Sequence, residues 1–433
     1  MEWSRKYSLR SYLRSSLWVG PVLAYVASIV LVRLIGYLDT WLAWSWDWHM
    51  EVATVHSVLE GLVAATISFI VFAFSSLLVA IQVASAQLTP RIIATTLLRD
   101  PTIRSIVALF VLTLSFALGT LVRSQTAVQY LLLSCAIVLA GASTVAFIYL
   151  IDYAARLLRP VSVVWRLGEE GLAVIEQVYP SRIKGKHVPT VPHAPPGAPA
   201  RTLFHQGRSA ILLAVDLETL KREAEARQGT IEFAHQIGDF IAVGEPLFLL
   251  HDGAAAADER RLRAAVAFGP ERTIEQDATF AFRVIVDIAL KALSRAINDP
   301  TTAVLAIDQL HRLLRAVGRR HLHDDVIRDA AGTVRLVLRT ADWEDFLQLS
   351  CREIRLYGAD NYQVVRRLRA MLQNLLATLP EARHAAVLRE LDLLDRTLDR
   401  LPMLAEDLAL SRVADLQGLG APQRDTRLQP SDA

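Results

Sequence analysis

The sequence predicts a membrane α-helical protein with four transmembrane helices, followed by a cytoplasmic α+β region in which a small β-barrel-like module precedes a helical bundle. Three observations predict this fold class. The chain of 433 residues is 53% hydrophobic and yet 21% charged, and its long apolar runs lie almost entirely within residues 1–152. Short apolar runs separated by glycine follow residue 202. Helical periodicity then dominates from residue 256.

Composition divides the chain into five parts. Residues 1–152 form the four-helix transmembrane domain, and residues 153–201 form a connector with a proline-rich linker. Residues 202–255 form the β-rich, barrel-sandwich-like module, and residues 256–415 form the cytoplasmic helical domain. We expect residues 416–433 to be a disordered tail, because they are polar and rich in proline and glycine.

Four apolar segments reach the roughly 20 residues that are needed to cross a bilayer. Arginine and lysine gather before the first segment, between the second and third, and after the fourth, whereas the first loop is acidic. By the positive-inside rule both termini are cytoplasmic, and the tryptophans at positions 41–48 then mark the outer interface. We therefore expect a multi-pass protein whose main partner is the lipid bilayer. The segments are residues 17–36, 58–89, 103–122 and 130–151.

Two charged residues lie inside the apolar segments near their outer ends. Arg33 is near the outer end of the first segment and Glu60 near the outer end of the second. In an antiparallel helix pair they could meet at similar depth and neutralise each other. Each side chain could equally extend to the interface by itself.

The second apolar segment also carries a polar stripe. Its members recur at helical spacing and so share one narrow face of the helix. At some 30 residues this helix is about 45 Å long, so it must tilt or protrude from the membrane before Pro90 ends it. The stripe consists of Ser68, Ser75, Gln82, Ser85 and Thr89.

A polar stripe means that one face of the helix meets something other than lipid. It could pack against neighbouring helices through close approach and interhelical hydrogen bonds. It could also line a water-filled pore around a symmetry axis, and that arrangement requires a homo-oligomer. Both interpretations remain open from the residues alone.

The β-rich module contains the run "GTIEFAHQIGDFIAVGEPLFLLH", which alternates apolar residues with turns at Gly229, Gly238 and Gly244. The run resembles the half-motif of a biotinyl or lipoyl carrier fold. No lysine occurs between Lys221 and Lys291, so the module has no attachment point for a swinging arm. We therefore expect a structural or ligand-binding module without a cofactor.

A helical hairpin is predicted immediately after the module. Apolar spacing gives a helix over about residues 277–296, a tight turn at Asn298, and a second helix capped by Asp299 with Pro300 in its first position. The polar residues at the two helix starts could simply be caps. They could also converge on the open amino end of the second helix and bind a small anion or nucleotide. They are Arg272, Gln276, Asp277, Asn298, Asp299, Thr301 and Thr302.

The rest of the chain, residues 321–415, reads as helical throughout. The run "HLHDD" contains His321 and His323, which point to different sides of a helix, so we expect no metal site there. The two cysteines, Cys135 and Cys351, are too few for a disulfide framework or a metal site. A net charge of +2 argues against a nucleic-acid partner.

Several of these stretches together resemble a bacterial family of predicted membrane proteins that is catalogued as a domain of unknown function. They are "FAFSSLLVAIQVASAQLTPRII", "LRDPTIRSIVALFVLTLSFALGTLVR", "GDFIAVGEPLF" and "ALSRAINDPTTAVLAID", of which "INDPTTA" is the most specific. The resemblance extends to about residue 400. It implies an inner-membrane protein with four helices and a cytoplasmic carboxyl-terminal region, and it implies no activity.

Three functions remain, from different classes. An oligomeric channel or transport-related protein, gated by its cytoplasmic domain, accounts best for the polar stripe. A membrane-anchored sensor or scaffold would bind a partner or a small anionic ligand through that domain. An enzyme that uses Arg272, Asp277 and Asn298 has the least support, since the sequence contains no phosphate-binding loop and no nucleophile paired with a base.

Overall fold

The computed structural model describes residues 3, 16, 18–42, 50–87, 100–125, 128–157, 159–183, 197–322 and 326–420, with the backbone alone for residues 80 and 83–87. The chain divides into two compact units, one within Arg10–Ser162 and the other within Val163–Ala433. Each unit is described by itself.

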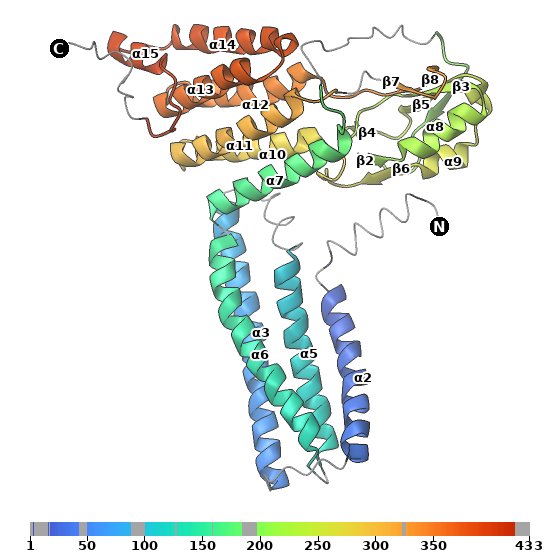
Figure 1. The fold of residues 1–433 in the computed structure, drawn as a ribbon, viewed down its shortest axis with the longest axis vertical. Coiled ribbons are helices and arrows are strands. Elements are labelled where there is room, and N and C mark those ends of the chain that lie inside the picture. The colour runs from blue at the N-terminus through green and yellow to red at the C-terminus, as the bar shows by residue number, and fades with distance from the viewer. Residues whose placement is uncertain are drawn as a thin grey trace, which may run out of the picture. The chain divides into compact units, whose positions relative to one another are not determined.

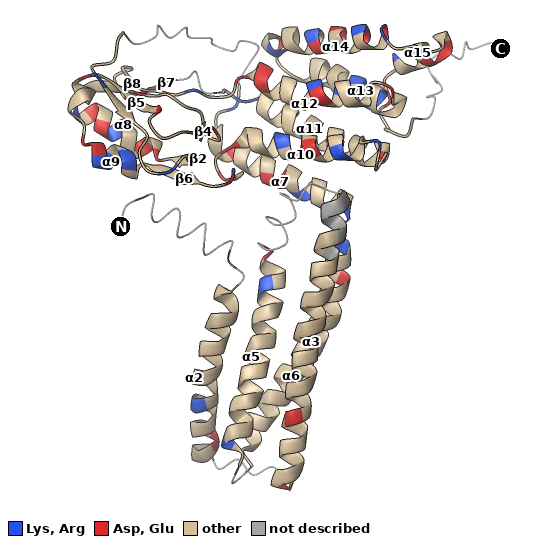
Figure 2. Ribbon diagram, turned by 180° about the vertical axis from the view of Figure 1, so that it is seen from behind, with Lys and Arg blue, Asp and Glu red and all other residues tan. Residues whose placement is uncertain are grey.

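Long apolar helices make up the first unit (Figure 1). Four of them are long and apolar enough to cross a membrane, as the sequence predicts. Figure 2 shows few charged residues along them. The longest has 36 residues, about 54 Å at 1.5 Å per residue, and so exceeds the hydrocarbon thickness of a bilayer. The helices are α2 (Val19–Leu42), α3 (Val52–Gln87), α5 (Pro101–Arg123) and α6 (Tyr130–Leu157).

Helix α5 packs against α2, α3 and α6. Small residues bring it close to α2, since a Cβ atom added at Gly119 would lie 3.0 Å from Val32. Thr113 on α5 and Ser143 on α6 are both buried, and their hydroxyls share a hydrogen bond of 2.8 Å. The first unit is therefore held by close packing and by polar pairs between helices.

Acidic residues cap two of these helices. Asp100 accepts hydrogen bonds from the first turn of α5, with Pro101 in the first helical position. The Tyr153 hydroxyl of α6 donates to the same carboxylate at 2.7 Å. Asp39 accepts a hydrogen bond from the backbone of Leu131 at 3.2 Å, which satisfies an open amide at the start of α6.

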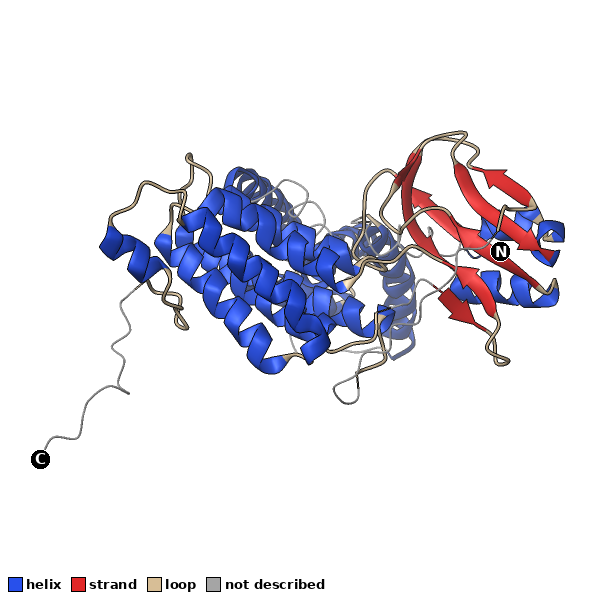
Figure 3. Ribbon diagram, turned by 90° about the horizontal axis from the view of Figure 1, so that it is seen from above, coloured by secondary structure: helices blue, strands red, loops and turns tan. Residues whose placement is uncertain are grey.

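The second unit combines two sheets with a set of helices, and Figure 3 shows its strands gathered on one side and most of its helices on the other. One sheet has the order β1-β5-β3-β8-β7 and the other the order β4-β2-β6. All pairs are antiparallel except β3 with β8. The strands are β1 (Arg201–Phe204), β2 (Ala210–Val215), β3 (Gly229–Phe233), β4 (Phe240–Ile241), β5 (Pro246–Asp252), β6 (Val266–Gly269), β7 (Val326–Arg328) and β8 (Val334–Val337).

The prediction of a barrel-like module is not confirmed, because the described strands form two sheets that do not close on each other. The prediction that residues 321–415 are helical throughout is wrong for strands β7 and β8. They pair with each other across a turn and add to β3 through the parallel partners Ile231 and Leu336. Leu336 is fully buried in the core of the module, so tertiary packing selects the strand.

Helices supply the remainder of the second unit. Short helices α8 (Leu217–Ala226) and α9 (Glu259–Ala264) accompany the sheets, and Asp216 caps α8. The larger helices pack together, with α10 against α11 and α12, and α13 against α11 and α14. They are α7 (Pro160–Val178), α10 (Ala278–Ala292), α11 (Pro300–Gly318), α12 (Trp343–Gly358), α13 (Tyr362–Thr378), α14 (His384–Leu398) and α15 (Ala405–Ser411).

The predicted hairpin is confirmed in α10 and α11. Asp277 caps α10, and Asp299 caps α11 with Pro300 in the first position. Asn298 has a φ of 48°, the left-handed backbone that a tight turn between helices requires. The first helix ends at Ala292, a turn earlier than predicted, because a hydrogen-bonded turn at Ser294 precedes Asn298.

Two glycines allow α7 to pack closely against α11. A Cβ atom added at Gly168 would lie 2.2 Å from Oε1 of Gln309, and one added at Gly171 would lie 3.0 Å from Leu313. Both glycines are buried. This close approach places the last turn of α7 beside the carboxyl-terminal half of α11.

Candidate functional site

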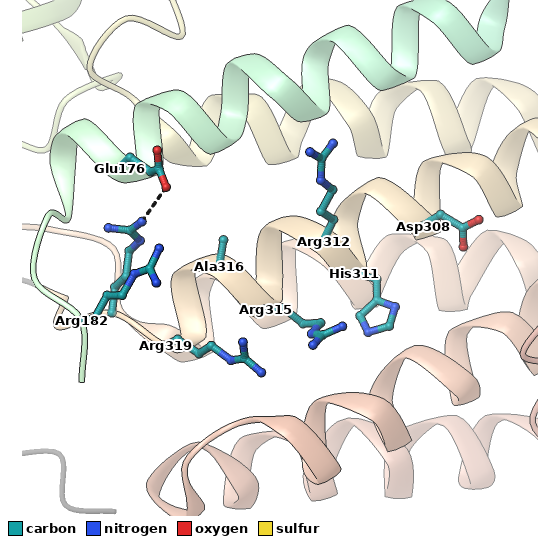
Figure 4. A pocket seen from close by; sticks show the side chains of 9 residues that line it. Glu176, Arg182, Asp308, His311, Arg312, Arg315, Ala316 and Arg319 are labelled. Carbon is teal, nitrogen blue, oxygen red and sulfur yellow. Dashed lines mark hydrogen bonds and ion pairs between the residues drawn. The ribbon is translucent and has the colours of Figure 1, made fainter. Parts of the chain in front are cut away.

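A cavity of about 370 Å³ opens along α11 in the second unit (Figure 4). Most of its walls come from one face of α11, and the rest come from the end of α7 and the segment that follows. Five of the lining residues are arginines. The lining consists of Glu176, Arg182, Asp308, His311, Arg312, Arg315, Ala316, Arg319 and Arg320.

Helical periodicity gathers the α11 residues. Positions 308, 312, 315 and 319 are three or four residues apart, so their side chains lie along one face. Figure 4 shows His311, Arg315 and Arg319 following one another along the helix. The opposite face of α11 carries fully buried residues such as Ile307 and Leu314, which hold the helix in the core. Burial of the apolar residues of α11 therefore orients its basic residues toward the cavity.

Arg182 reaches the cavity from a distant part of the sequence. An isolated antiparallel bridge pairs it with Arg320. The amide of Ile183 donates to the carbonyl of Arg319, and the amide of His321 donates to the carbonyl of Ser181, both at 2.9 Å. These backbone bonds hold the segment after α7 against the end of α11.

Arg320 is a structural member of the cavity wall. Its side chain is buried, and its guanidinium donates to the carbonyl of Tyr179 at 2.7 Å and to Glu176 at 3.0 Å. A buried guanidinium must be paired and hydrogen-bonded to be tolerated. We conclude that Arg320 fastens α11 to α7.

Carboxylates compensate two further charges at the edges of the cavity. Arg312 forms an ion pair with Glu169 at 2.7 Å and stacks over the ring of Trp165, 4.7 Å from its centre. Asp308 accepts from Arg367 at 2.5 Å. Both lining carboxylates, Glu176 and Asp308, are therefore already engaged.

Three lining arginines remain without a carboxylate. Within the ranges that the structure describes, Arg182 and Arg315 form no ion pair, and Arg319 donates only to the backbone carbonyl of Thr378, at 3.2 Å. Each guanidinium presents several N–H donors in a planar fork. The cavity therefore has an excess of positive charge and of hydrogen-bond donors.

His311 completes the cavity between Arg315 and Asp308. A hydrogen bond of 2.9 Å joins its Nε2 to Oδ1 of Asn374 on α13. Burial lowers the pKa of His311, and the positive charges of Arg367 and Arg315 lower it further. The lowered pKa favours the neutral ring, and either a fall in pH or an added negative charge nearby favours the charged ring.

The residues that the sequence singled out in the second unit lie elsewhere. Arg272 forms an ion pair with Asp277 at 2.8 Å, and Asp277 caps α10. The side chain of Gln276 accepts from the backbone of Val215 in β2 at 3.1 Å. These contacts join the start of α10 to the sheet module, and both oxygens of the Asp277 carboxylate accept hydrogen bonds.

The structure does not bring that group together with the start of α11. Asn298, Asp299, Thr301 and Thr302 lie at the other end of α10, which has 15 residues and is about 22 Å long. Asp299 accepts from the amide and hydroxyl of Thr302, and Thr301 is exposed. The two groups of polar residues are thus two separate helix caps.

The polar stripe lies on an exposed face of α3. Ser68, Ser75 and Gln82 are exposed within the first unit, and the Ser68 hydroxyl donates to the carbonyl of Ala64. The side chain of Ser85 and the whole of Thr89 lie outside the described residues. Within the first unit, none of the described helices covers the described part of the stripe.

Other predicted features are partly outside the described residues. Arg33 and Glu60 are both exposed, and no ion pair joins them in the described part of α2 and α3. The run "HLHDD" is described only at His321 and Leu322. Among the residues that were searched, no group of histidine, cysteine and carboxylate side chains could hold a metal ion.

The arginine cavity was not predicted from the sequence, although part of its signal was available. The run "HRLLRAVGRR", residues 311–320, places arginine at helical spacing on one face. That pattern also fits an ordinary solvated face. The contributions of Glu176 and Arg182 could not be found, because they come from about 130 residues earlier in the chain.

Comparison with known proteins places the chain in a family. The family described as "Predicted membrane protein (DUF2254)" matches residues 14–374, which include every residue of the cavity. Two mycobacterial relatives, "Uncharacterized protein Rv1290c" of Mycobacterium tuberculosis and "Uncharacterized protein Mb1321c" of Mycobacterium bovis, are each 28% identical over 417 residues. These alignments cover 92% of this chain and 79% of each relative. No solved structure was found to match. The chain belongs to the predicted membrane protein family DUF2254.

Proposed function

We propose that the protein is a membrane-anchored sensor or scaffold of the bacterial inner membrane, and that its second unit binds a small anionic ligand in the arginine cavity. Both termini and the second unit are then cytoplasmic, as the arrangement of arginines and lysines along the sequence indicates. The observation that carries the proposal is that Arg182, Arg315 and Arg319 line one cavity and have no carboxylate partner in the described chain.

Electrostatics supports anion binding at this place. Like charges gathered in one cavity repel one another, and an anion removes that repulsion while it accepts charge-assisted hydrogen bonds. Arginine stays charged at any physiological pH, so the cavity cannot relieve the repulsion by losing protons from its arginines. The two lining carboxylates cannot relieve it either, because each already pairs with another arginine.

Thermal unfolding of the full-length protein in detergent tests this function. We expect sulfate and phosphate, but not chloride at equal ionic strength, to raise the unfolding temperature. The substitutions Arg182→Gln and Arg315→Gln should each abolish the increase. Arg400→Gln removes an equal charge from an exposed site after α14 and should leave the increase intact. Stabilisation that is the same in all four proteins would contradict the proposal.

An oligomeric channel or transport-related role is the second candidate, and one observation favours it. None of the described helices of the first unit covers the exposed Ser68, Ser75 and Gln82, so a second copy could cover them in a homo-oligomer. Ion flux through protein reconstituted in liposomes should then fall with Gln82→Leu. Equal flux with Gln82→Leu and with Ala65→Leu, which enlarges an exposed apolar residue outside the stripe, would remove the stripe from the mechanism.

A further inference from the structure

We infer that the ligand of the arginine cavity is a soluble small molecule with two or more linked phosphate groups. This inference rests on the proposed function, because it names the class of anion that the same cavity binds. It follows from the spacing of the free guanidinium groups, the size of the cavity and the chemistry of its lining.

The basic residues are spread too widely for one phosphate ion. His311 and Arg319 are eight residues apart along α11 and its C-cap, about 12 Å at 1.5 Å per residue. Arg182 comes from the other wall, on the segment beside Arg320. A single tetrahedral anion that contacts Arg182 and Arg319 therefore leaves Arg315 and His311 for a second anionic group. Figure 4 shows Arg319, Arg315 and His311 in that order along α11.

The size of the cavity agrees with a ligand larger than an inorganic ion. At about 370 Å³ it lies within the range of roughly 300–1,000 Å³ that is typical of small-molecule sites. The neighbouring carboxylates limit where negative charge can go. Glu176 stands beside Arg320 at one end and Asp308 beside Arg367 at the other, so the uncompensated positive charge lies between them.

The lining also indicates that the ligand has no large apolar part. Of the residues that line the cavity, only Ala316 has a purely apolar side chain. The other apolar surface of the walls belongs to the stems of charged side chains, whereas most small-molecule sites are lined mainly by apolar and aromatic side chains. Affinity must therefore come from charge-assisted hydrogen bonds. Phosphate groups suit this better than carboxylates, since each carries up to two charges and offers three acceptor oxygens to guanidinium forks.

The expected protonation of His311 on ligand binding is consistent with the same ligand. Its pKa is depressed in the free protein by burial and by Arg367 and Arg315, whereas Asn374 and Asp308 oppose that effect. A bound phosphate beside Arg315 would add negative charge next to the ring and favour the imidazolium. His311 would then donate to the ligand through the ring nitrogen that does not face Asn374.

Ligand-dependent thermal unfolding of the full-length protein in detergent tests this inference. Pyrophosphate should half-saturate the stabilisation at a concentration at least about tenfold below that of orthophosphate or citrate, which corresponds to about 1.4 kcal/mol. Arg315→Gln should reduce that advantage to about twofold or less, and Arg400→Gln should preserve it. Because Arg315→Gln could alter folding, Arg315→Lys provides a second variant, which should keep the unfolding temperature and lose most of the advantage.

The experiment distinguishes failure of this inference from failure of the proposed function. Orthophosphate or citrate that binds as tightly as pyrophosphate would overturn this inference and leave anion binding in place. Absence of stabilisation by any of the three anions would overturn both. In nanodiscs of zwitterionic lipid the pyrophosphate effect should persist. Stabilisation by anionic lipid alone, with no further effect of pyrophosphate, would show that a lipid headgroup supplies the phosphates and would overturn the assignment of a soluble ligand.

Discussion

The guanidinium of Arg367 on α13 is bonded to the carboxylate of Asp308 on α11, with Nε 2.5 Å from Oδ1. The same guanidinium donates to the carbonyl of Leu416 at 2.9 Å, near the end of the described chain. One side chain thus connects the edge of the arginine cavity to the carboxyl-terminal segment. It also removes from the cavity one of the two negative charges that line it.

The carboxyl-terminal segment should detach when Arg366 is replaced. This side chain is fully buried and donates to the carbonyls of Val413 and Gly420, both at 3.0 Å. Arg366→Met removes both bonds and should destabilise the protein by about 2–3 kcal/mol. Limited proteolysis with trypsin, followed by mass spectrometry, should then show faster cleavage after the exposed Arg412. Arg396→Met, at an exposed site on α14, should leave that rate unchanged.

A larger residue at Gly171 should disturb the cavity from a distance. Its added atoms would meet Leu313 at 3.0 Å and Ala281 at 3.2 Å, so α7 must move away from α11. Gly171→Val should lower stability by about 1–3 kcal/mol and weaken anion binding, because Glu176 and Arg182 follow on the same segment. The control is Ala173→Val, which places the same side chain on the exposed face of α7. Equal anion affinity in the two variants would contradict this dependence on α7.

Gly238 should be intolerant of a side chain for two separate reasons. Its φ of 97° is left-handed, and an added Cβ atom would lie 2.1 Å from Arg272 and 2.5 Å from Asp277. Gly207 has a similar φ of 102°, and an added Cβ atom there would meet nothing within 4 Å. Gly238→Ala should therefore cost about 1–2 kcal/mol more than Gly207→Ala, which reports backbone strain alone. Unfolding temperatures that fall equally would show that the Arg272–Asp277 pair can move freely.

Stability should fall as the pH decreases below about 6.5, in part through His311. Burial depresses the pKa of this ring from an ordinary value of 6.5. Between the depressed and the ordinary value the unfolded chain binds more protons than the folded protein, so stability rises with pH across this window and is complete above it. His311→Gln should flatten that part of the profile. An unchanged profile would assign the dependence to other groups.

Anion binding should show the opposite trend with pH. A bound anion favours the imidazolium, so stabilisation by sulfate should be larger at pH 6 than at pH 8. Sulfate is suitable because its own charge does not change in this range. The difference should vanish in His311→Gln, whereas a difference that persists there would point to another titrating group.

Part of the fold follows from the sequence because its causes are local. Four runs of apolar residues are long enough to cross a bilayer, and the structure has a helix at each. The caps at Asp277 and Asp299 could be predicted because a cap depends on the few residues that follow it. The hydrogen bonds of a cap join residues at most four positions apart, so their formation depends little on tertiary structure.

Strands β7 and β8 show where local reasoning fails. β7 and β8 pair with each other, but their place in the sheet depends on β3, about 100 residues earlier. The predicted polar cluster fails for a related reason. Arg272 and Asn298 are close in sequence, but the rigid length of α10 separates them.

The sequence by itself determined the membrane-capable helices, the helical hairpin and the membership in a family, because composition, periodicity and capping are properties of short segments. Only the tertiary structure decided that Arg182 meets Arg315 and Arg319 in one cavity. That arrangement depends on two buried glycines of α7, which let two distant segments approach closely, and on Glu169, Glu176 and Arg367, which pair with some of the cavity's charges and leave the others free.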